Sequence, residues 1–495
     1  MLSRRTILSL MAKGSAGLAL TPRAFAHELP SKTGALINDV HSKLNPTLVH
    51  DVVPVESLAA VQSVIGRARG ENRAVSIAGG RHAMGGQQFG TGTTNVDTRA
   101  MNRVLHLDED RGIVEVEAGI QWPELISRLD QMQAGSLRRW SIIQKQTGAD
   151  RLCLGGALGA NIHGRGLKLK PIINDVESFV LVDPNGVAKI CSRGENPELF
   201  RLAIGGYGLF GVITSLKLRL MPRRKLERVV KLANIDTLMQ SFEERIAEGY
   251  LYGDCQFSID PKSADYLNKG VFSCYRPVDD AVLMPASQKL LSADDWRKLY
   301  YLAHADPARI FDLYSSYYLS TSGQIYWSDT HQLSTYIDDY HQLVDRQMEA
   351  VFPASEMITE VYVPRRSLGE LMWLLAADFR RHNVQVIYGT IRLIERDTES
   401  FLAWAKQDYV CVVMNLHVDH GPQGITRSAE DFRRIIDRAI ELEGNFFLTY
   451  HRWATREQVE TCYPQMTRFL ELKRRYDPDE LFQSDWYRHY QSLFA

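Results

Sequence analysis

The chain has 495 residues, which is more than a single hydrophobic core usually serves, so we expect two or three domains. Its formal net charge is −1 and it has no long basic run, which argues against nucleic acid as the main partner. No apolar run beyond the N-terminal leader is long enough to span a membrane as a helix.

The first 26 residues have the features of an export signal. The pair Arg4-Arg5 precedes a weakly apolar stretch that ends at Leu20, and Ala24-Phe25-Ala26 matches an A-x-A cleavage site. This order is typical of the twin-arginine route, which exports folded proteins. We therefore expect a periplasmic protein that loses residues 1–26 and receives a cofactor before export. A disordered tail that contains an arginine pair by chance is the alternative.

The segment after the leader has the pattern strand, helix, strand. A strand is expected over 48–53, and residues 56–70 place apolar side chains at helical spacing. An alternating strand follows at 75–78 and ends in the run GGRHAMGG, residues 79–86. Glycines let backbone amides approach a ligand closely, and successive N–H groups can hold an anion. This predicts a loop that binds a negatively charged group, with His82 inside it.

A second glycine-rich stretch follows at residues 154–166, LGGALGANIHGRG, and again contains a histidine, His163. We expect a second loop of the same kind, and two such loops indicate a long ligand with more than one phosphate. Around this stretch, helices are expected over 122–132 and 198–203. Strands are expected over 104–107, 113–118, 175–182, 187–191 and 212–220.

Residues 206–211, GYGLFG, satisfy the G-x-G-x-x-G pattern of dinucleotide-binding domains. That pattern needs a strand before it, a helix after it and an acidic residue about twenty positions later. Here a β-branched, strand-like stretch follows, and Lys231 stands near the acidic position. The sequence therefore predicts no Rossmann site, although the glycines can still pack beside a ligand.

The order of these motifs carries a family resemblance. GGRHAMGG is followed by NVDTRAMN at 95–102, by LGGALGANIHGRG, and by FRLAIGGYGLFGVI at 200–213. This order resembles the FAD-binding domain of the vanillyl-alcohol-oxidase superfamily, the PCMH-type fold. The Ile-His-Gly element and the ending YDPDELFQSD, residues 476–485, are most similar to sugar-alcohol and aldonolactone oxidases and to decaprenylphosphoryl-ribose oxidase.

The resemblance implies an α+β fold in three parts. A two-subdomain PCMH-type FAD-binding domain would occupy 45–224. A substrate cap, an antiparallel sheet flanked by helices, would occupy 225–443. The C-terminal segment 444–495 would return to the FAD domain, with one helix over 457–476.

The resemblance also implies where FAD binds. The first loop would hold the pyrophosphate through Gly79, Gly80, Arg81, His82, Ala83 and Met84. The flavin and ribityl side would lie against Gly155, Gly156, Gly159, Asn161 and His163, and the adenine near the backbone of Ile213. In many members the histidine that matches His82 is bonded to the flavin 8α-methyl group. We expect this bond, with a non-covalent phosphate contact as the alternative.

Some members of the superfamily add a cysteine as a second tether to the flavin. Cys153 lies only two residues before Gly155-Gly156, which is not the usual offset, so we expect one tether. The six cysteines form no C-x-x-C pair, and we expect buried thiols and no metal site.

The expected cap places three strands over the flavin, at 357–364, 384–393 and 409–418. Alternation puts Glu360, Arg392 and His417 on one side of them. A base and a cation suit alcohol oxidation, because hydride leaves carbon for flavin N5 while a base takes the hydroxyl proton. Strand side chains with no part in the chemistry are the alternative, above all for Glu360.

Near the C-terminus, related oxidases carry a His or Lys close to the flavin. This chain has Thr449-Tyr450-His451-Arg452-Trp453 at that place and so departs from the family pattern. Tyr450 and His451 are therefore the candidates for the base.

Together these features predict an FAD-dependent oxidoreductase that acts on a CH–OH group of a sugar, polyol or lactone. Dioxygen as the electron acceptor would make it an oxidase, and a periplasmic cytochrome or quinone would make it a dehydrogenase. The bulky Ile162 before His163 is compatible with both. An enzyme for phenolic or C–N substrates, and a flavin-binding protein without turnover, are the alternatives.

Overall fold

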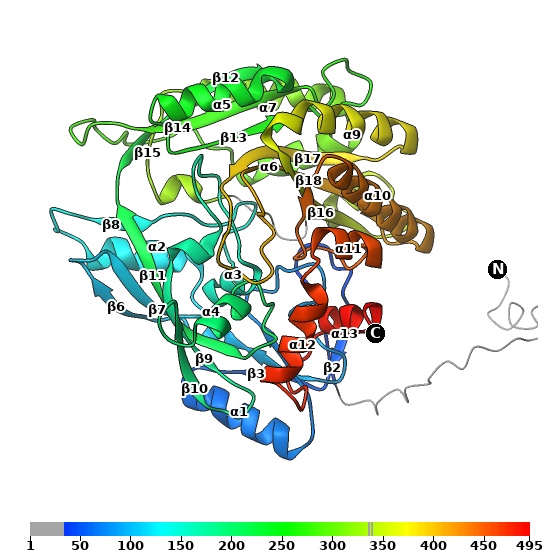
Figure 1. Ribbon diagram of the computed structural model, residues 1–495. Coiled ribbons are helices and arrows are strands. Elements are labelled where there is room, and N and C mark those ends of the chain that lie inside the picture. Colours follow the sequence, from blue (N-terminus) through cyan, green and yellow to red (C-terminus); the bar gives the residue numbers. More distant parts are fainter. Residues whose placement is uncertain (1–33, 335–336, 338–339) are drawn as a thin grey trace, which may run out of the picture. The chain divides into compact units, whose positions relative to one another are not determined.

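Strands and helices alternate along the chain in a computed structural model that describes residues 34–334, 337 and 340–495 (Figure 1). The expected export signal, residues 1–26, lies outside the described residues. The mixture of helices with mainly antiparallel strands agrees with the predicted α+β class. Among the described helices, none is both long and apolar enough to cross a membrane.

The first glycine loop starts at the end of a small parallel sheet. In this sheet β5 (Thr94–Asp97) lies between β3 (Asp51–Pro54) and β4 (Val75–Ala78), and α1 (Leu58–Gly70) connects the outer strands. The predicted strand–helix–strand unit is confirmed. The strand expected over 48–53 is interrupted at His50, because its first half, β2 (Thr47–Val49), pairs instead with β1 (Ala35–Ile37).

A six-stranded sheet follows, in the order β10-β9-β11-β7-β6 with β8 paired to β11, and all its pairs are antiparallel. The predicted strands of this region are confirmed. They are β6 (Val104–Asp108), β7 (Ile113–Glu117), β9 (Val176–Val182), β10 (Ala188–Ser192) and β11 (Val212–Pro222), joined by the short β8 (Trp140–Ile142). The two predicted helices are α2 (Trp122–Met132) and α4 (Pro197–Ala203).

The second glycine-rich stretch begins as a helix, so its prediction as a loop was wrong for residues 154–160 and right for 161–166, which contain His163. Leu154–Ala160 form α3, which ends at Asn161 in the left-handed conformation, with φ of 50°. Gly155 packs so closely that an added Cβ would lie 3.0 Å from the Cβ of Ala118 and 3.1 Å from its carbonyl oxygen. The small residues therefore allow a helix to approach β7, where the prediction had assumed an open loop. The GYGLFG run leads into β11 rather than a helix, so the rejection of a Rossmann site is confirmed.

An eight-stranded antiparallel sheet contains the later strands, in the order β15-β12-β14-β13-β17-β18-β16-β19. The three strands predicted over the flavin are confirmed as neighbours: β16 (Ala354–Pro364), β17 (Val386–Ile394) and β18 (Tyr409–Asp419). The other strands are β12 (Lys225–Asn234), β13 (Tyr252–Phe257), β14 (Lys269–Pro277), β15 (Ile325–Trp327) and β19 (Asn445–Phe446).

Helices flank this sheet, as Figure 1 shows for α9 and α10 beside β16 to β18. Helix α10 packs Phe432, Ile435 and Ile436 into the core, which also takes up Val361 and Ile391 of the sheet. The helices are α5 (Leu238–Ala247), α6 (Ala293–Ala305), α7 (Pro307–Ser320), α8 (Tyr340–Gln347), α9 (Leu368–His382) and α10 (Pro422–Glu441).

The C-terminal segment ends in three helices: α11 (Arg456–Cys462), α12 (Met466–Tyr476) and α13 (Asp485–Leu493). The single helix expected over 457–476 was wrong, because Pro464 cannot continue a helix and separates α11 from α12. After α12 the chain reaches β4. Val75 N–H donates to the Leu481 carbonyl at 2.7 Å, and Gln483 N–H donates to the Val75 carbonyl at 2.9 Å.

Candidate functional site

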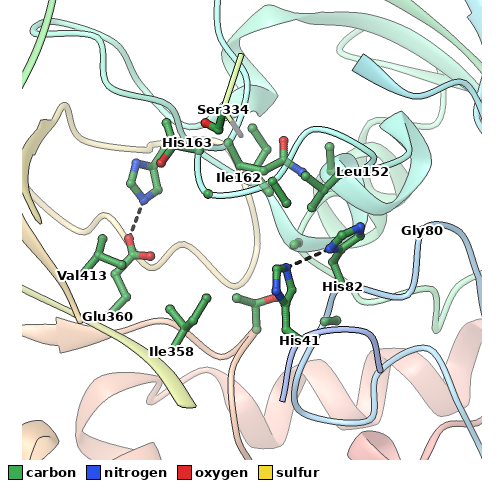
Figure 2. Close-up of a pocket in the computed structure, with 18 of the residues that line it drawn as sticks. His41, Gly80, His82, Leu152, Ile162, His163, Ser334, Ile358, Glu360 and Val413 are labelled. Atoms are coloured by element: carbon green, nitrogen blue, oxygen red, sulfur yellow. Dashed lines mark hydrogen bonds and ion pairs between the residues drawn. The ribbon is translucent and has the colours of Figure 1, made fainter. Parts of the chain in front are cut away.

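A cavity of about 760 Å³ connects the first glycine loop, helix α3 and the face of the eight-stranded sheet. Figure 2 shows two pairs of side chains in its wall, His41 with His82 and His163 with Glu360, with Leu152 and Ile162 between them. The cavity thus brings together both histidines that the sequence singled out. The cavity also reaches the aromatic side chains of α6 and α7, including Trp296, Tyr314 and Tyr318.

The first glycine loop lines the cavity through every residue predicted for it: Gly79, Gly80, Arg81, His82, Ala83 and Met84. Side chains are excluded at its start. A Cβ added at Gly79 would lie 2.9 Å from the Cβ of Cys153, and one at Gly80 would lie 2.5 Å from the Arg151 carbonyl oxygen. The loop therefore presents backbone to the cavity, as close binding of an anionic group requires.

Polar atoms in this end of the cavity are left without partners. Arg81 Nε and Gln88 Oε1 are buried and have no hydrogen-bond partner among the described residues. Buried polar atoms are nearly always hydrogen-bonded in folded proteins, so these two fit a site completed by a polar ligand. A dinucleotide with a pyrophosphate, such as FAD, matches this combination of backbone amides and an arginine.

His82 is held by a residue that the sequence did not indicate. Its Nε2 lies 3.0 Å from the Arg151 carbonyl oxygen, and its Nδ1 lies 2.8 Å from His41 Nε2. A carbonyl only accepts, so we assign the His82 proton to Nε2, and His41 Nε2–H then donates to Nδ1. Burial lowers the pKa of His41 to about 4. A single sequence does not link positions 41 and 82, because these residues meet only through a tertiary contact.

Helix α3 and the residues after it line the cavity through Gly155, Gly156, Gly159 and His163, and Ile213 lines it from the start of β11. Asn161 does not. Its side chain donates to Asp397 Oδ2 at 2.9 Å and accepts from the Ile173 N–H at 3.2 Å. The structure thus does not bring the Asn161 side chain to the cavity: Asn161 ends α3 and anchors neighbouring loops.

Glu360 is the centre of a buried hydrogen-bonded cluster. His163 Nε2 contacts its Oε1, which also accepts from Tyr362 Oη at 2.6 Å and Cys411 Sγ at 3.1 Å. Tyr450 Oη donates to the other oxygen, Oε2, at 2.9 Å. By distance, His163, Glu360 and Cys411 also suit a metal ion, but each ligand atom is already used in these bonds.

The environment of Glu360 keeps it ionised. Burial raises the pKa of a carboxyl group, but the electrostatic interaction with His163 and the bonds from His163, Tyr362 and Cys411 outweigh burial and lower the pKa of Glu360 to about 2. Burial and the Glu360 charge raise the pKa of Tyr450 well above its usual value. The cluster therefore presents a carboxylate whose donors include one cavity-lining phenol, Tyr450.

Arg392 lines the same cavity from β17, where it pairs in register with Cys411 of β18. The side chain is buried, with 7% of its surface exposed, and no described carboxylate forms an ion pair with it. A buried cation without a counter-charge is costly. The arrangement therefore suits a ligand with oxygen atoms that accept from the guanidinium.

Two predicted catalytic residues do not line the cavity. His417 lies opposite Glu356 in register, past the cavity-lining part of β18, with its ring 5.3 Å from that of His304. His451 stacks on Trp453 with ring centroids 4.3 Å apart, while its neighbour Tyr450 points into the cavity. The structure therefore does not bring His417 or His451 to the cavity surface, and the roles of Glu360, Arg392 and Tyr450 stay predictions.

Comparison with known proteins also supports an FAD-binding site. Residues 50–192 match a family model described as an FAD binding domain. The chain is 28% identical over 225 residues to rice L-galactono-1,4-lactone dehydrogenase 1, which covers 44% of this chain and 37% of the relative. It is 27% identical over 190 residues to bovine L-gulonolactone oxidase, with 38% and 41% covered. The chain thus spans well under half of the length of these two relatives.

One relative aligns along nearly its whole length. Decaprenylphosphoryl-beta-D-ribose oxidase of Mycolicibacterium smegmatis is 22% identical over 494 residues, which is 94% of this chain and 99% of the relative. All three names denote oxidoreductases of sugar-like molecules. The alignment with the third reaches the eight-stranded sheet as well as the glycine loops.

Proposed function

We propose, from the premise that residues 50–192 form an FAD-binding domain related to those of aldonolactone oxidoreductases, that this chain is an FAD-dependent oxidoreductase. It oxidises a CH–OH group of a sugar, polyol or lactone. The observation that carries the proposal is the shared cavity, in which the glycine loop faces Glu360, Tyr450 and Arg392 across α3. A flavin-binding protein without turnover would not need this polar cluster.

In the proposed reaction, FAD supplies the hydride acceptor. The glycine loop holds its pyrophosphate, and the small residues of α3 give the cofactor room along the cavity. Arg392 holds and orients a substrate oxygen. Tyr450 Oη, which bridges the cavity and Glu360 Oε2, receives the hydroxyl proton from the substrate while its own proton moves to Glu360.

We also propose that the flavin is bonded to His82. The imidazole lines the cavity in a defined orientation, between His41 and the Arg151 carbonyl. Denaturing precipitation of the purified protein tests this: yellow colour should stay with the pellet, and His82→Ala should release it. Colour that washes out of the unchanged protein would contradict the covalent bond, and the proposal of an FAD-dependent oxidoreductase would stand.

Export by the twin-arginine route and a periplasmic location are further proposals, and they rest on Arg4-Arg5 and Ala24-Phe25-Ala26 alone. The electron acceptor is dioxygen or a periplasmic cytochrome or quinone. Stopped-flow reoxidation separates these: slow reaction of the reduced protein with air, together with fast reaction with cytochrome c, identifies a dehydrogenase.

An anaerobic substrate panel tests the proposed function. FAD-loaded protein is mixed with L-galactono-, L-gulono- and D-arabinono-1,4-lactone, with alditols, with phenols and with amines, and flavin absorbance is followed. Bleaching by a lactone, sugar or polyol supports the proposal. Bleaching only by a phenol or an amine would indicate an enzyme for phenolic or C–N substrates. No bleaching by any class would favour a flavin-binding protein without turnover.

A further inference from the structure

The hydrogen bonds around His163 and Glu360 indicate where the protons lie. Tyr362 Oη, Tyr450 Oη and Cys411 Sγ each bring a proton to the Glu360 carboxyl group, at 2.6, 2.9 and 3.1 Å. A carboxyl group that accepts from three hydroxyl or thiol donors has no need of a proton of its own. Glu360 is therefore a carboxylate, and it can only accept from His163.

The other nitrogen of His163 also faces an atom that can only accept. Its Nδ1 lies 2.9 Å from the Gly164 carbonyl oxygen, and its Nε2 contacts Glu360 Oε1. Each nitrogen needs a hydrogen to make its bond. We infer that His163 is an imidazolium, held by the Glu360 carboxylate as a fixed positive charge in the cavity wall, and that it is not the base of the reaction.

The rings around His163 suit a cation. Trp404, Tyr362 and Phe447 lie with ring centroids 5.2, 6.3 and 6.5 Å from the imidazole. An aromatic ring within about 6 Å attracts a positive charge through its π electrons, most strongly when water is excluded, and Trp404 lies within that distance. His163 and Glu360 are 4% and 3% exposed, so the pair is hardly screened. The proton count and the aromatic surroundings thus both favour a positively charged His163.

The consequence for the site rests on the proposed function. A positive charge that does not depend on the substrate stabilises negative charge that develops on a reduced flavin or on a substrate oxygen. Glu360 acts on this charge as a positioning residue, because its carboxylate keeps the second proton on His163. The same carboxylate receives the substrate proton through Tyr450, at its other oxygen.

Nitrogen NMR of the FAD-loaded, full-length protein with 15N-labelled histidine tests the inference at pH 7.5. The spectrum is compared with that of His163→Gln, which identifies the His163 signals. Two protonated ring nitrogens are expected, and one bare nitrogen would overturn the inference. In Glu360→Gln, one nitrogen of His163 should lose its proton. That second variant also assigns the signals if His163→Gln does not fold.

Glu356→Gln is the matched control. Glu356 lies on the same strand and in the same cavity wall, but it bonds to Asn415 at 2.7 Å rather than to His163. His163→Gln should make the flavin midpoint potential more negative, and Glu356→Gln should leave the His163 signals unchanged. An unchanged potential in His163→Gln would overturn the role of the charge.

The two proposals fail separately. If the panel of lactones, sugars and polyols leaves the flavin oxidised while His163 shows two protons, the proposed function is wrong and the charge assignment stands. If a lactone bleaches the flavin while His163 carries a single proton, the assignment is wrong and the proposed function stands.

Discussion

At the residue scale, the two oxygens of one carboxylate have different surroundings. Glu360 Oε1 accepts from His163, Tyr362 and Cys411, whereas Oε2 accepts from Tyr450. Of the two tyrosines, only Tyr450 lines the cavity. Tyr450 is therefore placed to pass a substrate proton to Glu360, and Tyr362 is placed to hold the carboxylate.

This asymmetry predicts different effects for two similar substitutions. Tyr450→Phe should lower kcat by about 10²-fold or more with FAD content unchanged, since a positioned proton acceptor contributes about 10²–10⁴-fold. Tyr362→Phe removes a bond to the same carboxylate without opening the proton path, and it should cost stability more than turnover. Steady-state kinetics of both variants measure the loss of kcat, and thermal melts measure the loss of stability. Equal losses of kcat would contradict the assignment.

A second residue-scale prediction concerns the number of flavin tethers. Cys153 lines the cavity next to Gly79, but burial raises the pKa of its thiol to about 11, so it stays protonated and is a poor nucleophile. Cys153→Ser should therefore keep the flavin in the denatured pellet as fully as the unchanged protein does. Loss of colour in this variant would make Cys153 a tether.

Sequence predicted part of the site at this scale. Alternation of period two placed Glu360 and Arg392 on the cavity face, and the same rule extends to Tyr362, two residues after Glu360. His417 obeys the alternation and still misses the cavity, because register along β18 decides which part of the face is lined. His41 and Cys411 were not found, since their partners come from distant segments.

At the scale of elements, the strands that carry the site were predictable and the glycine-rich helix was not. Runs rich in β-branched and aromatic residues predict β16, β17 and β18, which are long enough for this composition to show. Glycine has a low helix propensity, and LGGALGA resembles the first glycine-rich loop, so its sequence favours a loop. It is helical because Gly155 lets α3 pack on Ala118, a tertiary contact that outweighs propensity.

Two glycines of α3 should respond in opposite ways to alanine. A Cβ at Gly155 meets Ala118 at 3.0 Å, whereas a Cβ at Gly156 meets nothing within 4 Å on the cavity side. Gly155→Ala should lower the free energy of unfolding of the FAD-free protein. Gly156→Ala should raise it by about 0.5–1 kcal/mol and weaken FAD binding, because the methyl group enters the cavity. Unfolding curves and FAD titration check both; unchanged FAD affinity in Gly156→Ala would place the cofactor elsewhere.

The contribution of the turn after α3 to the free energy of unfolding should depend on pH through Asp175. Gln144 accepts from Gly164 N–H at 3.0 Å and donates to Asp175 Oδ2 at 2.7 Å. Burial raises the pKa of Asp175 from 3.8 to about 6, although its bond to Gln144 lowers it. The folded protein therefore holds this proton more tightly than the unfolded chain, and the contribution to stability is complete below pH 4 and is lost as pH rises through about 6.

Asp175→Asn should remove this pH dependence. Relative to the unchanged protein, the variant should gain up to about 3 kcal/mol in the free energy of unfolding between pH 4 and pH 8, as the shift in pKa requires. Urea unfolding at several pH values measures this difference. A difference that stays constant over the range would contradict the raised pKa.

At the scale of the whole molecule, segments far apart in sequence close one cavity. The segment before the FAD-binding match at residues 50–192 supplies His41, the eight-stranded sheet supplies Glu360, and Thr449 and Tyr450 come from the C-terminal segment. The family resemblance implies that the C-terminal segment returns to the FAD-binding domain. The way the C-terminal segment pairs with β4 followed only from the structure, because a single hydrogen-bonded edge leaves no pattern in the sequence.

FAD should therefore stabilise the molecule as a unit. In His82→Ala, where loading is reversible, FAD at 100 times its Kd should raise the free energy of unfolding by about 2.7 kcal/mol and shift a single thermal transition upward. A melt that splits into two transitions, with one unaffected by FAD, would show that the eight-stranded sheet does not share the site.

The structure of the FAD-loaded protein tests the central claim most directly. We predict that the dinucleotide lies along the cavity, with its pyrophosphate on residues 79–84 and its flavin ring between His82 and His163, facing Glu360, Tyr450 and Arg392. A flavin bound outside this cavity, or with its ring turned away from Glu360, would contradict the account.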